Sequence, residues 1–95
     1  MKVIWSPQSR KDYWQNIEYL EAEWTFQDVE NFIEKVDDTI LLLLKNNIKF
    51  ISSNYKNVDK VVITKQITLY YRTNKNVIEL LRFWNTYQDI ENFKL

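Results

Sequence analysis

The spacing of apolar residues changes near the middle of this chain, and that change limits what it can fold into. From Tyr13 to Leu43 the apolar residues recur every three or four positions, as on one face of an α-helix. From Lys60 onward they form short β-branched and aromatic runs, as in half-buried strands. Helices followed by strands, rather than alternating with them, indicate an α+β fold.

Two helices are predicted in the first half of the chain. Ser6 can cap the first helix and Pro7 suits its first position, because the proline ring fixes φ where no N–H partner is needed. Thr25, with Asp28 three residues on, forms an imperfect capping box that starts the second. The first helix has an apolar face of Tyr13, Ile17, Leu20 and Trp24, with Trp14 beside it. The second has Phe26, Val29, Ile33, Val36, Ile40 and Leu43.

A single capping residue between two such helices predicts an αα-hairpin. We expect the leucine-rich run at 40–44 to lie in the deepest part of the core, because large exposed apolar patches are unusual on monomers. The segment from there to Asn57 is expected to be irregular.

Three strands are predicted at 60–64, 66–72 and 76–84, and a short one at 2–5. A two-residue loop at Asn74-Lys75 would place Arg72 opposite Val77. One face of the resulting hairpin is then apolar, with Ile67, Leu69, Tyr71, Ile78 and Leu80. The predicted fold is α+β: an N-terminal strand at an edge or beside the last strand, and an αα-hairpin packed on one face of a mostly antiparallel three- to four-stranded sheet. Residues 1–95 are expected to form a single domain.

Composition excludes several kinds of chemistry. The chain has no cysteine and no histidine, so disulfides, thiolate nucleophiles, imidazole bases and the commonest zinc sites are excluded, and no metal or cofactor is expected. No apolar run is long enough for a membrane span or a signal peptide, which predicts a cytoplasmic protein without a membrane partner. The formal net charge is zero, and direct sequence-specific DNA binding is not expected.

Few residues could carry chemistry. Arg72 could bind a phosphate, or it could form a cross-strand ion pair with Glu79. Arg82 is expected on the helix-covered face, with its charged end reaching solvent at the sheet edge. Tyr87 could transfer a proton only if nearby cations lowered its pKa from about 10. Trp84 could stack on a base or simply close the core.

Two stretches of the sequence carry a resemblance to a known family. The opening "VIWSPQSRKDYWQNIEYL" is similar to a strand followed by a Ser-Pro or Thr-Pro helix start, and the later "ITLYYRTNKNVIELLRFWNTYQD" to a closing hairpin with a Tyr-x-Arg type strand. In this order, and at this length, they resemble the RelE/ParE superfamily of bacterial toxins. The resemblance implies the toxin of a type II toxin–antitoxin module, held inactive by a cognate antitoxin.

The same resemblance implies two activities and suggests where they would be carried. RelE-like members cleave mRNA on the ribosome without a metal, and on that alternative Arg72, Arg82 and Tyr87 are the candidate catalytic residues. ParE-like members poison DNA gyrase. Efficient cleavage would need clustered cations or a strong base, whereas this chain offers Lys65 and the two arginines. We therefore favour a ParE-like toxin that inhibits growth by binding a target such as DNA gyrase, over a nuclease or an inactive family member.

The surfaces expected to contact the antitoxin are the aromatic-rich segments at 50–55 and 83–93. The candidate partner-binding residues are Phe50, Tyr55, Trp84, Tyr87 and Phe93.

Overall fold

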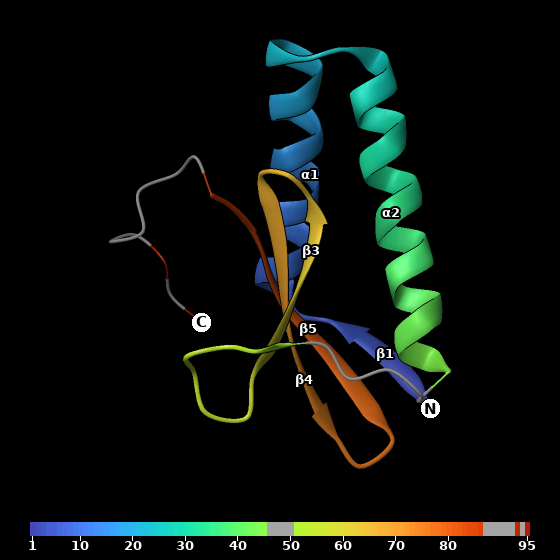
Figure 1. Ribbon diagram of the computed structural model, residues 1–95, viewed down its shortest axis with the longest axis vertical. Helices are drawn as coiled ribbons and strands as arrows, with labels where there is room; N and C mark the ends of the chain where they lie inside the picture. The colour runs from blue at the N-terminus through green and yellow to red at the C-terminus, as the bar shows by residue number, and fades with distance from the viewer. Residues whose placement is uncertain (46–50, 87–92, 94) are drawn as a thin grey trace.

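The computed structural model describes residues 1–45, 51–86, 93 and 95. In this part of the chain, one face of a five-stranded sheet is covered by two helices that lie side by side (Figure 1). The elements in chain order are β1 (Lys2–Trp5), α1 (Pro7–Glu23), α2 (Phe26–Leu44), β2 (Ile51–Ser52), β3 (Asp59–Thr64), β4 (Ile67–Asn74) and β5 (Val77–Asn85). The strands are ordered β1-β5-β4-β3-β2, so the last strand lies next to the first. The predicted α+β architecture is confirmed.

Both predicted helix starts are confirmed by their caps. The Ser6 hydroxyl accepts a hydrogen bond from the Ser9 N–H at 3.0 Å, which satisfies one of the free N–H groups of the first turn. Thr25 and Asp28 form a complete capping box: the Asp28 N–H donates to Thr25 Oγ1 at 3.2 Å, and the Thr25 N–H donates to the Asp28 carboxylate at 3.0 Å. These caps fix where the hairpin turns.

The apolar faces of the helices differ from the prediction at three places. Trp24 and Phe26 are exposed, because they flank the tip of the helical hairpin, which extends past the turn between β3 and β4 (Figure 1). Leu41 is 58% exposed, and Leu42 also faces outward, so the prediction of a wholly buried leucine run is wrong. A helix buries only the positions along its packed side. In α2 those positions are Val29, Phe32, Val36, Thr39 and Leu43.

The hairpin of β4 and β5 has its turn one residue later than predicted. Lys75 and Asn76 form the turn, and Asn74 pairs with Val77. Arg72 consequently lies opposite Glu79 rather than Val77. The shift moves the register by two residues, so the predicted inner face is preserved. Its residues Ile67, Leu69, Tyr71, Ile78 and Leu80 are all buried, as predicted.

A β-bulge in β5 changes which face its last residues occupy. Tyr71 pairs with Leu80 but Tyr70 pairs with Arg82, which leaves Leu81 as the extra residue. Because paired residues share a face, Arg82 lies with Tyr70 on the face away from the helices. The predicted position of Arg82 on the helix-covered face is therefore wrong. The bulge also turns Phe83 inward, where it is 2% exposed.

The two outer strands complete the sheet. β1 pairs in parallel with β5 from Lys2 opposite Val77 to Trp5 opposite Leu80, which confirms the predicted place of the N-terminal strand. The short β2 pairs with Asp59 and Lys60 of β3, in a segment that was predicted to be irregular. Neither of the two described helices is long and apolar enough to span a membrane.

Candidate functional site

The face of the sheet away from the helices carries most of the candidate residues, and we call it the outer face. Tyr70 and Arg72 of β4 lie on it, and Glu79, Arg82 and Trp84 of β5 lie opposite or beside them. The structure thus places the two candidate arginines on one face. Arg82 pairs with Tyr70, which is two residues before Arg72 on β4. Tyr87 and Phe50 lie outside the described residues.

Arg82 is held by a buried carboxylate on α1. Its Nε donates to Asp12 Oδ2 at 2.6 Å and its Nη2 to Asp12 Oδ1 at 3.2 Å. The two side chains are only 12% and 5% exposed, so this is a buried, bidentate ion pair. The same carboxylate also accepts from the Phe83 N–H at 3.1 Å and from the Gln8 amide at 3.0 Å. The expectation that the charged end of Arg82 reaches solvent is therefore wrong.

Asp12 belongs to a row of polar side chains at the start of α1, formed with Ser6 and Asn16, that hydrogen-bonds to the edge of β5. β1 covers this edge only as far as Leu80. Beyond it, the Ser6 hydroxyl donates to the Leu81 carbonyl at 3.2 Å, and the Asn16 amide donates to the Phe83 carbonyl at 3.1 Å. Side chains of α1 and of its N-cap residue Ser6 thus take the place of a neighbouring strand and satisfy backbone groups of β5 that would otherwise lack partners.

Sequence reasoning missed this row, although a signal was present. Ser9, Asp12 and Asn16 are all at most 5% exposed. They recur at three and four residues, the spacing of a buried helix face, beside the apolar stripe of Ile17 and Leu20. Polar residues at such a spacing indicate a helix side that faces backbone groups rather than solvent.

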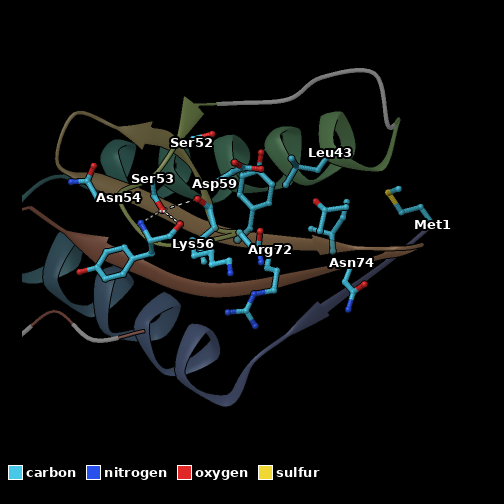
Figure 2. A pocket seen from close by; sticks show the side chains of 15 residues that line it. Met1, Leu43, Ser52, Ser53, Asn54, Lys56, Asp59, Arg72 and Asn74 are labelled. Atoms are coloured by element: carbon cyan, nitrogen blue, oxygen red, sulfur yellow. Dashed lines mark hydrogen bonds between the residues drawn. The ribbon is translucent and has the colours of Figure 1, made fainter.

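Arg72 has a different environment. Its Nη1 lies 3.7 Å from Glu79 Oε1, and both side chains are more than 40% exposed. The predicted cross-strand ion pair is therefore present, with its partners directly opposite. Arg72 also lines an open hollow of about 1020 Å³ (Figure 2). The hollow is also lined by Ser53 and Lys56 of the β2–β3 turn, by Asp59 of β3 and by Asn74 of β4.

Lys65 lies away from Arg72 and Arg82. It lies in the turn that precedes β4, whereas Arg72 lies near the far end of that strand. Lys65 lines a separate hollow of about 570 Å³ between the helical hairpin and this turn, together with Trp24 and Lys35. Lys65 is thus separate from the two arginines, and the three cations that the sequence offered for a phosphate do not form one cluster.

Three of the candidate partner-binding aromatics meet on the outer face. The ring of Phe93 is stacked on Tyr55 with centroids 5.4 Å apart, and its centroid is 4.9 Å from that of Trp84. Tyr70 meets the same ring edge-on at 4.6 Å. Trp84 and Phe93 are buried even though neither α1 nor α2 covers this face. Phe93 therefore closes part of the outer face.

Tyr70 is a poor general base at neutral pH. Burial raises the pKa of Tyr70 above its ordinary value of 10.0, and the neighbouring Tyr55 raises it further. A tyrosine that acts as a general base near neutral pH needs its pKa lowered instead. Among the described residues there is no cluster of carboxylates that could hold a metal ion. The outer face thus presents aromatic rings and the Arg82 guanidinium as groups that can contact a partner.

No family model and no curated protein matches this sequence. Similar solved structures include the chromosomal ParDE TA system from P. aeruginosa, with 12% identity, 90% of this chain and 95% of that chain covered, and a TM-score of 0.73. Another is a copper-bound mutant toxin from Helicobacter pylori, with 17% identity, coverage of 98% and 99%, and a TM-score of 0.69.

A third is the heterotetrameric YoeB-YefM toxin-antitoxin complex from Staphylococcus aureus, with 19% identity, coverage of 86% and 92%, and a TM-score of 0.60. Each of these likenesses covers most of both chains. The described part of this chain has the fold of RelE/ParE-type toxins.

Proposed function

We propose that this chain is the toxin of a type II toxin–antitoxin module, and that it inhibits growth by binding a cellular target rather than by cutting RNA. The first part is supported by the fold, since structures that share it are named as toxins or as toxin–antitoxin assemblies. The second part is supported by the electrostatics of the outer face.

The observation that carries the binding mode is that both outer-face arginines already face carboxylates. The Asp12 carboxylate lies 2.6 Å from Arg82 Nε in a buried pair, and Glu79 lies 3.7 Å from Arg72. Phosphoryl transfer needs preorganised positive charge aimed at the developing anion, and the loss of one such contact costs about 10²–10³ in rate. A guanidinium neutralised by a carboxylate contributes much less of that field. The chain also has no histidine, and the pKa of Tyr70 is raised.

The partner that keeps the toxin silent is a cognate antitoxin. We propose that it covers the outer face around Tyr55, Trp84 and Phe93, because aromatic side chains dominate the energetics of protein interfaces. In the similar YoeB-YefM structure the two components form a heterotetrameric complex, which supports an antitoxin as partner.

The proposed target is DNA gyrase, and induced expression in a bacterial host tests it. We expect growth to stop, plasmid supercoiling to change, and primer extension on cellular transcripts to show no new codon-positioned cuts. Arg72→Ala should weaken the growth defect through lost target contact. Arg10→Ala, which removes an exposed cation from α1, is the matched control and should leave the defect unchanged.

The same experiment separates the alternatives. Transcript cuts that disappear in Arg72→Ala would replace the binding mode with a RelE-like, ribosome-dependent nuclease. Growth arrest without a change in supercoiling or transcripts would remove gyrase as the target while keeping the binding mode. Normal growth at a verified level of folded protein would mark an inactive member of this fold.

A further inference from the structure

Phe93 is the feature of the outer face that the proposed activity leaves unexplained. The residue lies beyond the last described strand, yet it is only 8% exposed. Its ring contacts Tyr70 of β4 and Trp84 of β5, on the sheet face that neither α1 nor α2 covers. A side chain outside the helices and strands near a terminus is ordinarily poorly ordered unless something ties it down. Specific contacts must therefore hold it.

Those contacts come from separate segments and all involve rings or a cation. Tyr55 belongs to the turn after β2, Tyr70 to β4 and Trp84 to β5. The guanidinium carbon of Arg82 lies 5.3 Å from the centroid of the Trp84 ring and 5.9 Å from that of Phe93. We call Tyr55, Tyr70, Trp84 and Arg82 the aromatic seat.

The geometry of the seat favours an aromatic occupant over an aliphatic one. The Phe93 ring is stacked on Tyr55 with an interplanar angle of 17°, and it meets Tyr70 at 86°, an edge-to-face contact. Both arrangements are preferred by ring quadrupoles, and the Arg82 cation is attracted to the ring face. A leucine would fill much of the volume but would make none of these electrostatic contacts.

We propose that the aromatic seat is a recognition site for an aromatic side chain, and that Phe93 is its resident ligand. Phe93 then competes in cis with any protein partner that presents an aromatic side chain to the outer face. This last step rests on the proposed function, whereas the existence of the site does not. Because Phe93 is tethered, its effective concentration at the seat is high, and a partner binds only to the fraction of molecules in which the seat is open.

The site is tested with the purified full chain carrying Phe93→Ala and a synthetic peptide of residues 86–95. Calorimetric titration should show saturable binding of the peptide to the variant. The wild-type chain should bind the same peptide at least tenfold more weakly, because its own Phe93 fills the seat. A peptide with alanine at the Phe93 position should not bind. Equal binding of the peptide to the wild-type and variant chains would overturn the proposal.

Ring specificity is tested on the same protein with two further peptides. A peptide with tyrosine in place of Phe93 should bind within a few-fold of the original, and one with leucine at least tenfold more weakly. If the leucine peptide bound as tightly as the original peptide, the seat would bind any apolar side chain, and the proposed recognition of aromatic rings would be overturned. The absorbance titration of Tyr70, assigned with Tyr70→Phe, should move to lower pH in the Phe93→Ala variant than in the wild-type chain, because loss of the ring that meets Tyr70 edge-on reduces the burial that raises its pKa.

These measurements use neither the antitoxin, a cellular target nor growth. If the peptide binds as described while expression proves harmless, the toxin proposal fails and the seat stands. If the peptide does not bind to folded Phe93→Ala protein while expression stops growth, the seat fails and the toxin proposal stands. Far-UV circular dichroism of the variant establishes that it is folded in either case.

Discussion

Removal of the Asp12 carboxylate is expected to destabilise the fold strongly. In Asp12→Ala the Arg82 guanidinium, whose side chain is 12% exposed, loses its buried counter-charge, and the Phe83 N–H loses its acceptor. Breaking a buried ion pair by removing one partner costs about 3–5 kcal/mol. A domain of this length has a total stability of about 5–14 kcal/mol at the usual ~0.05–0.15 kcal/mol per residue. The substitution therefore removes roughly a fifth or more of the free energy of unfolding.

Urea denaturation followed by circular dichroism measures this loss. With an m-value of about 2 kcal/mol/M, a loss of about 4 kcal/mol lowers the midpoint by about 2 M. Glu79→Ala is the matched control, because it breaks an ion pair on the same sheet whose partners are exposed and should cost about 0–1 kcal/mol. The double variant Asp12→Ala/Arg82→Ala should lose less than the sum of its single variants. Similar midpoints for Asp12→Ala and Glu79→Ala would refute the view that the buried pair anchors α1 to β5.

Three smaller perturbations have defined outcomes. Burial raises the pKa of Tyr70 and of Tyr13, so both hydroxyls keep their protons to a higher pH in the folded chain than in the unfolded chain. Their contribution to the free energy of unfolding should be constant below pH 10.0 and fall above it, and Tyr70→Phe should reduce this fall in a pH series of thermal melts. Lys75 has a φ of 57°, and Lys75→Gly should stabilise the chain by about 0.5–1 kcal/mol in urea, whereas a lower midpoint would show that the left-handed turn is unstrained. The buried Thr64 hydroxyl has no hydrogen-bond partner among the residues that the structure describes, so Thr64→Val should stabilise the chain by about 1 kcal/mol and raise the urea midpoint; a lower midpoint would mean that the hydroxyl is satisfied in solution.

The sequence was sufficient for the architecture because each element carries a local signal. Ser6 and Thr25 mark the helix starts by their capping chemistry, and alternation marks the inner face of the hairpin. The turn at Lys75-Asn76 was misplaced because asparagines lie on both sides of Lys75, and no glycine marks the left-handed position. The error did little harm, since a register shift of two residues keeps each side chain on its face.

The candidate site was harder to predict because it depends on long-range geometry. The bulge at Leu81 reverses the face of every later residue in β5, and no local pattern in "LLRFW" reveals it. The Asp12 and Arg82 pair joins residues 70 positions apart. The contact between Arg72 and Glu79 was anticipated, since both were expected in the same hairpin.

The placement of β5 also determines when this fold can form during synthesis of the chain. β5 lies between β1 and β4 in the sheet, although it is made after the other four strands. The contacts that join α1 to it span 67 to 75 residues. Contacts of such long sequence separation form slowly, and here they need the strand that leaves the ribosome after all the others. The N-terminal strand and the polar row of α1 must therefore wait for β5, and the outer face forms only once that strand has emerged.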